Sequence, residues 1–162
     1  MRGIGLMRMA RLDRILRRMI ATAYPELRRL PIAVGFRALD GDTLFRYDWD
    51  QGRYSILAGE EFRDAPAAVV EGGVAHELAH LVRDSARPPR LLDRALDHYG
   101  RSRAYRIRDE RATDALAVQR GFGPQLIALI RYARSRGIRF HAEHGLHSRE
   151  IAARCRPPAA GA

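Results

Sequence analysis

The chain has 162 residues and a formal net charge of +10. This length suits one domain with a buried core and is short for two domains joined by a linker. Its single cysteine excludes a disulfide scaffold, because no intrachain disulfide can form, and such a chain suits a reducing cytoplasm.

The positive charge comes entirely from arginine, which occupies all 29 of the basic positions. We attribute this bias first to genome composition. A basic surface favours contact with nucleic acid, anionic lipid or acidic peptides. The arginines are spread along the whole chain and interleaved with Asp and Glu, which is typical of solvated faces, so the charge alone is weak support for nucleic-acid binding.

The N-terminal segment predicts an amphipathic helix. From Met7 to about Ala23, apolar residues recur three and four positions apart, which is the spacing of one helix face. Charged residues interrupt the apolar residues of Met1–Met19, so this segment fits neither a signal peptide nor a transmembrane helix. We expect the helix to pack on the domain, although a helix lying on a membrane surface has the same pattern.

Three short strands are predicted next. Apolar or aromatic runs cover Pro31–Phe36, Thr43–Tyr47 and Arg53–Leu57, and turn residues separate them at 39–42 and 48–52. Strands joined by hairpins pair antiparallel. We therefore expect a small antiparallel sheet of about three strands.

The remainder of the chain is predicted to be helical. A helix begins after Ala65-Pro66 and ends within Asp84–Pro89, because two consecutive prolines are not accepted in a helix interior. A short helix follows over Leu91–His98 and a longer one over Tyr105–Gln119. Another helix begins at Pro124, a residue favoured at a first helical position, and runs to about Ser135.

The order of these elements predicts an α+β fold: an N-terminal helix, a small antiparallel sheet, then a helix that carries the chemistry, followed by further helices. We expect one domain over residues 1–155. Proline, alanine and glycine dominate residues 156–162, which we expect to be a disordered tail.

The run His76-Glu77-Leu78-Ala79-His80 is an H-E-x-x-H motif on a predicted helix. Residues four apart lie on one helix face, so both imidazoles can reach the same metal ion. Glu77 is rotated by about 100° from His76, which lets its carboxylate contact a metal-bound water without binding the metal. The motif predicts Zn²⁺ as cofactor and Glu77 as general base.

The apolar residues of the same helix lie roughly opposite the two histidines. They are Val70, Val74, Leu78 and Leu81. The helix can therefore anchor in a core while its histidines face a cleft. The alternative interpretation is that both histidines are ordinary helix residues.

A catalytic zinc site needs a third protein ligand and an open position. The metzincin spacing is absent, because Arg83 and Ala86 stand at its glycine and last histidine positions. Glu110 and Asp114 lie four apart on a predicted helix, so one carboxylate can bind zinc while the other orients a ligand histidine. The alternative for Glu110 is a solvated charge paired with Arg106, one turn earlier.

The runs Gly73–Leu81 and Gly121–Pro124, with the pattern Glu110-x-x-x-Asp114 between them, resemble the gluzincin metallopeptidases of the HtpX type. Among these, the small soluble minigluzincins are the most similar. The resemblance covers about Pro31–Ala153. It implies Glu110 as the third zinc ligand, Asp114 as the support of a histidine, and a fold of helix, antiparallel sheet and helices.

A further motif concerns the transition state. Some members of that family carry a downstream histidine followed by basic and apolar residues, which His144–Ile151 resembles with altered spacing and with Gly145 in the place of a proline. This makes His144 and His147 candidates for stabilising the transition state. Other candidates are His98, Tyr105, His141 and several arginines.

These patterns predict a zinc-dependent endopeptidase that acts on peptides or unfolded proteins. Zinc lowers the pKa of its water and Glu77 accepts the proton. The strand over Arg53–Leu57 precedes the motif helix, and in families like the one resembled such a strand lies along the cleft. We expect an extended peptide to pair with its edge.

Three other readings stay open at this point. A basic module that binds nucleic acid or a protein partner around a non-catalytic zinc site is the alternative function, although Glu77 has no role in such a site. Zinc-dependent hydrolysis of another bond is the second. The third is latency, in which a C-terminal segment offers the Cys155 thiolate to the zinc. The sequence leaves the substrate and the oligomeric state undetermined.

Overall fold

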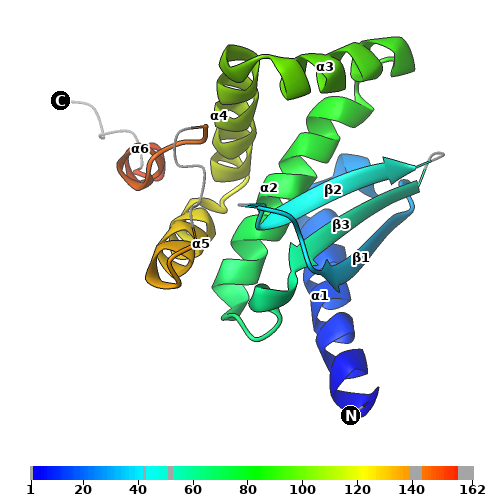
Figure 1. Ribbon diagram of the computed structural model, residues 1–162, viewed down its shortest axis with the longest axis vertical. Coiled ribbons are helices and arrows are strands. Elements are labelled where there is room, and N and C mark those ends of the chain that lie inside the picture. Colours follow the sequence, from blue (N-terminus) through cyan, green and yellow to red (C-terminus); the bar gives the residue numbers. More distant parts are fainter. Residues whose placement is uncertain (1, 42, 51–52, 139–143, 157–162) are drawn as a thin grey trace.

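The computed structural model describes residues 2–41, 43–50, 53–138 and 144–156. Within these ranges the chain has the expected α+β architecture, with an N-terminal helix, a three-stranded sheet and further helices (Figure 1). The helices are α1 (Arg2–Thr22), α2 (Ala67–Ser85), α3 (Pro89–Arg101), α4 (Arg103–Gln119), α5 (Gly123–Ser135) and α6 (Ser148–Arg154). The strands are β1 (Ile32–Arg37), β2 (Phe45–Asp50) and β3 (Arg53–Gly59), and short 3-10 turns cover Pro25–Leu27 and Glu60–Phe62.

The predicted helices are found at the predicted positions, but some of their first and last residues differ from the prediction. Helix α3 begins at Pro89 instead of Leu91, because proline fits the first turn of a helix, where its missing N–H has no intrahelical partner. The proline pair therefore ends one helix and begins the next. Helix α6 was not predicted, since seven residues are too few to show a helical period. The expected tail lies outside the described residues, apart from Arg156.

The sheet is mixed, so the prediction of a purely antiparallel sheet is wrong. Its strand order is β1-β3-β2, with β3 antiparallel to β2 and parallel to β1. The chain between β1 and β2 thus passes to the far edge, and only β2 and β3 form a hairpin. An alternating pattern shows which residues share a face, but it does not show which neighbour a strand takes.

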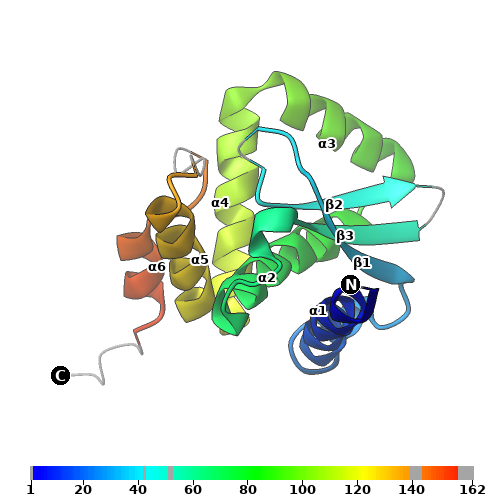
Figure 2. The same ribbon diagram turned by 60° about the horizontal axis from the view of Figure 1, so that its bottom comes forward.

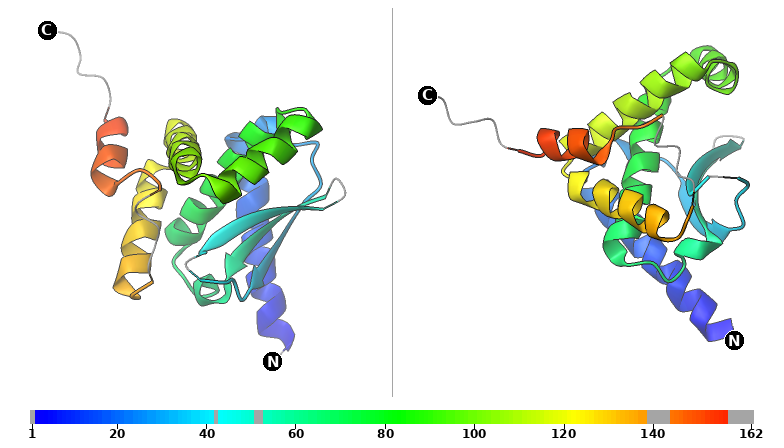
Figure 3. Two further views of the ribbon diagram at one scale, coloured as in Figure 1. Left: turned by 45° about the horizontal axis from the view of Figure 1, so that its top comes forward. Right: turned by 60° about the vertical axis from the view of Figure 1, so that its left-hand side comes forward.

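Helices α1 and α2 cover the same face of the sheet (Figure 3). The side chains on this face are Ile32, Val34, Phe36, Phe45, Tyr47, Tyr54, Ile56 and Ala58. The residues between them point the other way, and Arg37, Arg46 and Arg53 are exposed. The main core forms between this face and the two helices.

Helix α2 is the central element of the fold. The sheet and α1 lie on one side of it, and α4 and α5 pack on the other, with α6 beyond (Figure 2). The expected anchoring stripe is confirmed, because Val70, Val74, Leu78 and Leu81 are all buried. Among the helices in the described part of the chain, none combines the length and the apolar character needed to cross a bilayer.

Two glycines let α2 approach its neighbours closely. A methyl group at Gly72 would lie 2.4 Å from the carbonyl oxygen of Gln125 on α5. One at Gly73 would lie 2.3 Å from the ring of Phe45 on β2. Both separations are far below a van der Waals contact of about 3.5 Å, so a side chain at either position would push α2 away from the elements that complete the site.

We predict that Gly72→Ala destabilises the protein by roughly 1–3 kcal/mol, because the clash is with rigid backbone. Gly100→Ala is the matched control, since Gly100 also lies in a helix but a methyl group there has no neighbour within 4 Å. That control should be neutral or slightly stabilising, because alanine favours helix. Urea denaturation followed by circular dichroism measures both, and equal stabilities would contradict the role of Gly72.

Candidate metal centre

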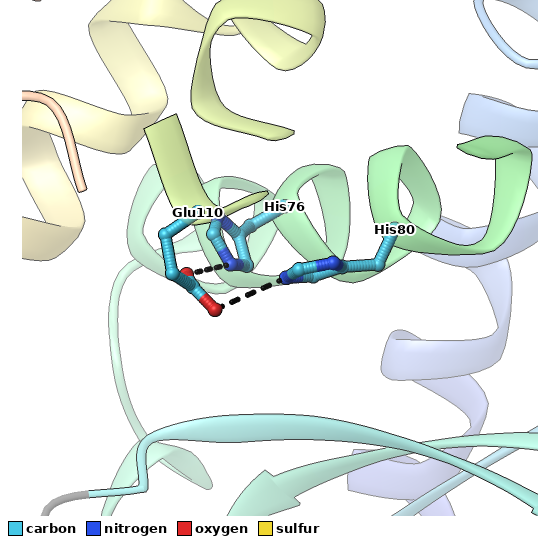
Figure 4. Close-up of side chains that lie close together, drawn as sticks. All are labelled: His76, His80 and Glu110. Carbon is cyan, nitrogen blue, oxygen red and sulfur yellow. Dashed lines mark ion pairs between the residues drawn. The ribbon is translucent and has the colours of Figure 1, made fainter. Parts of the chain in front are cut away.

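Three side chains from two helices converge in the way that one metal ion requires. His76 and His80 of α2 and Glu110 of α4 place their ligand atoms within 4.8 Å of one another. Nε2 of His76 lies 3.1 Å from Oε2 of Glu110, and Nε2 of His80 lies 3.4 Å from Oε1 (Figure 4). Tetrahedral zinc with bonds of about 2.0–2.2 Å separates its ligand atoms by about 3.3–3.6 Å. The two distances are close to this range but involve different oxygens of Glu110, so small side-chain movements would be needed for the three residues to hold one such ion.

The ring of His76 is oriented by Asp114, as the sequence predicted. Nδ1 of His76 lies 2.8 Å from Oδ1 of Asp114, whose other oxygen accepts a hydrogen bond of 2.7 Å from the backbone N–H of Leu146. A histidine that donates its Nδ1 proton to a carboxylate presents the Nε2 lone pair to a metal. A methyl group at Gly145 would lie 2.5 Å from Asp114, which explains glycine here.

The ring of His80 is oriented by residues that the sequence reasoning missed. Its Nδ1 lies 3.2 Å from Oγ1 of Thr113 and 3.5 Å from Oδ2 of Asp109. Arg83 holds both of them, at 2.6 Å from Oγ1 of Thr113 and 2.7 Å from Oδ1 of Asp109. Asp109 and Thr113 lie four residues apart, each one position before Glu110 and Asp114. This repeated spacing is the sequence feature from which their role could have been predicted.

Glu77 lies beside the three ligand residues without joining them. Its carboxylate is buried, and Oε2 accepts a hydrogen bond of 2.9 Å from the backbone N–H of Tyr47 on β2. Burial raises the pKa of Glu77 above its ordinary value, and the nearby His76 and His80 offset part of this effect. A carboxylate with a raised pKa is a better proton acceptor at neutral pH, which suits a general base.

The pKa values of His76 and Glu110 are shifted in opposite directions. Burial lowers the pKa of His76, but hydrogen bonds with Asp114 and Glu110 outweigh it, so the net pKa lies well above the ordinary value. Burial raises the pKa of Glu110, but hydrogen bonds with His76 and His80 outweigh it and leave the net pKa below its usual range. The pair is thus ionised near neutral pH.

The ligands open into a cavity of about 570 Å³. Its walls come from β2, α2, α3, α4, α5 and the segment around His144. Beyond the ligands, the lining residues include Leu44, Phe45, Arg46, Tyr47, Trp49, Gly73, Glu77, Asp84, Arg87, Leu96, Tyr99, Arg106, Leu126, Leu129 and Ile130. A cavity of this size with a few converging polar groups is typical of a binding site.

Strand β2 borders this cavity, which corrects the prediction for Arg53–Leu57. That segment belongs to β3, whose two edges are already paired with β1 and β2. Among the described residues no strand pairs with the other edge of β2, and the N–H of Tyr47 faces Glu77 from that edge. Because alternate residues of a strand face the same edge, Phe45 and Trp49 present their backbone groups in the same direction.

Of the other predicted site residues, one lines the cavity and several lie outside its lining. His144 is buried and lines the cavity, whereas His147 is exposed at the start of α6 and does not line it. His98 and Tyr105 stack on each other, with ring centroids 5.7 Å apart, and also lie outside the lining. His141 is outside the described residues. His144 is thus the histidine outside H-E-x-x-H that the described structure brings to the site.

Cys155 is also outside the lining. It is exposed at the end of α6, and a methyl group at Gly123 would lie 2.2 Å from its sulfur. The sulfur is therefore packed at the beginning of α5. The latency hypothesis requires this thiol to lie beside His76, His80 and Glu110. In the structure it lies neither in that cluster nor in the cavity lining.

Two tyrosines at the site were not predicted. The Tyr99 hydroxyl, from α3, donates a hydrogen bond to Oε1 of Glu110. The Tyr47 hydroxyl donates to Asp84, which also accepts a hydrogen bond of 2.7 Å from Arg87. Burial raises the pKa of both phenols, helped by the neighbouring carboxylates, so they remain donors at neutral pH.

Comparisons of the chain with protein-family models, with curated proteins and with solved structures found no match. The resemblance to the gluzincin metallopeptidases thus stays a prediction from the two helix motifs. What the site can do follows from its own side chains: two imidazoles and a carboxylate directed at one point, a buried carboxylate beside them, and a cavity that reaches them.

If the cluster binds zinc as the sequence predicts, Asp109→Asn should weaken that binding by roughly 10- to 100-fold, because residues behind a ligand histidine hold its ring and raise its basicity. Asp97→Asn is the matched control, since Asp97 forms an exposed ion pair with Arg101 on α3 and does not line the cavity. Competition with a chromophoric chelator measures both affinities. An unchanged affinity in Asp109→Asn would mean that Asp109 does not support His80.

Zinc binding should release about one proton per ion near pH 7, because a ligand that is protonated must lose its proton to bind. The raised pKa of His76 makes that residue the source, whereas Glu110, with its lowered pKa, is already ionised. The affinity should therefore rise with pH until the pKa of His76 is passed. Calorimetry in two buffers of different ionisation enthalpy counts the protons. His147→Ala should release the same number, and a binding enthalpy independent of the buffer would contradict the prediction.

Proposed function

We propose that the chain binds one zinc ion through His76, His80 and Glu110 and hydrolyses peptide bonds with Glu77 as general base. One observation carries the proposal: three donors of the right spacing meet beside a buried carboxylate, at a cavity bordered by a free strand edge. Structural zinc sites usually have four protein ligands. Within the described residues the cluster has three, which leaves a position for water.

The donor set favours zinc among the common metals. Two imidazole nitrogens and one carboxylate oxygen match catalytic zinc sites with two histidines and a glutamate. Calcium and magnesium prefer a set made of oxygen atoms alone. When bound, zinc would polarise a carbonyl oxygen and lower the pKa of water toward about 7.

The residues around the ligands have separate roles in the proposed reaction. Glu77 accepts a proton from the attacking water and can return it to the leaving amine. The N–H of Tyr47 holds the Glu77 carboxylate in place. Tyr99 and His144 both line the cavity and are the candidates for a second group that stabilises the developing oxyanion.

The free edge of β2 supports a peptide as substrate. An extended peptide can add to a strand edge through backbone hydrogen bonds, which tolerate many side chains. Phe45 and Trp49 offer such groups on either side of the position where Tyr47 contacts Glu77. The substrate class in this proposal is accordingly an extended peptide or an unfolded protein segment.

A nucleic-acid-binding module remains the alternative proposal, but two of the arginines close to the ligands are already paired with carboxylates. Arg83 and Arg87, close to the ligands, are engaged by Asp109 and Asp84 at 2.7 Å each. Binding to nucleic acid would weaken steeply with added salt, whereas hydrolysis at a zinc site would be lost with a chelator.

The proposal predicts about one zinc per purified chain, with loss of the metal in His76→Ala and in Glu110→Ala. Glu77→Gln should keep its zinc and lose hydrolysis of an unfolded protein such as reduced casein by roughly 100- to 10,000-fold, because the base is removed while the ligands stay. Elemental analysis and a fluorescent casein assay measure the two effects.

Glu71→Gln is the matched control for this experiment. Glu71 lies on the same helix, pairs with Arg18 at 2.6 Å and does not line the cavity, so its loss should change neither zinc content nor hydrolysis. Zinc retained in Glu110→Ala would show that another residue is the third ligand. Hydrolysis that survives in Glu77→Gln would exclude Glu77 as the base.

A further inference from the structure

Among the described residues, Arg106 differs from the other arginines that line the cavity, because no carboxylate forms an ion pair with it. Arg46 pairs with Asp48 at 2.8 Å, and Arg87 pairs with Asp84 at 2.7 Å. Arg106, on α4 and partly buried, forms no ion pair within the described part of the chain. A partly buried guanidinium without a carboxylate partner can pair with an anionic ligand.

The Arg106 guanidinium is held in place but keeps donors for a ligand. Nε donates to the carbonyl oxygen of Tyr99 at 3.2 Å, and Nη2 donates to that of Gly100 at 3.4 Å. These two bonds use two of the five N–H groups that an arginine carries. The remaining N–H groups can make the paired hydrogen bonds with which a guanidinium binds a carboxylate.

The position of this cation is next to the metal centre. The Cζ atom of Arg106 lies 5.6 Å from the centroid of the Tyr99 ring, over its face. The hydroxyl of the same ring donates to Glu110, the third ligand. The Tyr99 ring thus contacts both the guanidinium and Glu110.

The side of the cavity formed by α5 and the start of β2 is lined by apolar side chains. Phe45, Leu126, Leu129 and Ile130 line it, and all four are buried. A carboxylate would lose its hydration there without a partner. The described lining is thus apolar on α5 and includes the Arg106 guanidinium near α3.

We propose that Arg106 determines substrate specificity by binding a carboxylate of the peptide on the α3 side of the metal centre. The carboxylate comes from an acidic side chain close to the scissile bond or from a free C-terminus. An apolar residue on the other side of the bond occupies the end lined by α5. This inference rests on the proposed peptidase function, and it adds the chemical class of the substrate.

A purely structural role for Arg106 makes a different prediction. Its two hydrogen bonds end on carbonyl groups in the last turn of α3, where an arginine stabilises a helix end. If this were its whole role, a substitution would weaken all peptides equally. A role in specificity changes the ratio between acidic and neutral peptides.

The test uses the full-length Glu77→Gln protein supplied with zinc, so that binding is measured without turnover. The probes are fluorescent blocked octapeptides of alanine with one phenylalanine, and a glutamate placed one, two or three residues to either side of it. Each has a glutamine counterpart, and one further peptide has a free C-terminus matched by its amide. Fluorescence anisotropy gives the dissociation constants.

We expect one glutamate position, or the free C-terminus, to bind roughly 10- to 100-fold more tightly than its neutral counterpart. Which of them gains identifies the source of the carboxylate. Adding Arg106→Gln should abolish the ratio and leave the neutral peptides bound as before. Adding Arg106→Glu should make the matching lysine peptide the better ligand. Arg108→Gln removes the same charge from an exposed position of α4 and should keep the ratio.

Equal binding of acidic and neutral peptides, no binding of any peptide, or a ratio that survives Arg106→Gln would each overturn this inference. Failure of the proposed function gives a different result. A protein that prefers the acidic peptide through Arg106 but hydrolyses none of the peptides with Glu77 restored would contradict the peptidase and keep the carboxylate site. Hydrolysis without any preference for acidic peptides would support the peptidase and contradict the carboxylate site.

Discussion

The packing of α4 against α2 brings five carboxylates into a small, partly buried volume, and the rest of the site depends on how their charge is balanced. They are Glu77, Asp84, Asp109, Glu110 and Asp114. Buried carboxylates are stable only when cations or hydrogen-bond donors compensate them. Arg83 of α2 pairs with Asp109, and Arg87, just after α2, pairs with Asp84, while the two histidines face Glu110 and Asp114. The same balance that stabilises the packing leaves one position, between the imidazoles and Glu110, where a divalent cation would be favoured.

The elements around α2 and α4 convert this charge cluster into an accessible site. Close approach at Gly72 and Gly73 brings α5 and β2 against α2, so the cavity is walled on both sides. Strand β2 supplies a backbone donor to Glu77, and α3 brings Tyr99 over Glu110. The result is a cleft whose described lining is apolar on α5 and includes Arg106 near α3, which is the basis for our inference about that residue.

Much of the site could be predicted because its spacing is local. Residues four apart on a helix point in one direction whatever surrounds them, so the pairing of His76 with His80 followed from the motif. The choice of Glu110 as third ligand also needed Asp114, four residues later on the same helix. Asp109 and Thr113 have the same spacing and escaped notice, because a carboxylate and a hydroxyl on a helix have many possible partners and only the packing of α4 on α2 selects His80.

The sequence by itself determined the five longer helices, the apolar faces of α1 and α2, the α+β class and the relation of Glu77 to the two histidines. These depend on backbone geometry over a few residues. Only the tertiary structure decided that β2, and not the strand over Arg53–Leu57, borders the cavity. It likewise decided that His144 lies inside and His147 outside, and that Arg106 has no carboxylate partner within the described chain. Such choices depend on contacts between residues far apart in the chain, which no local spacing contains.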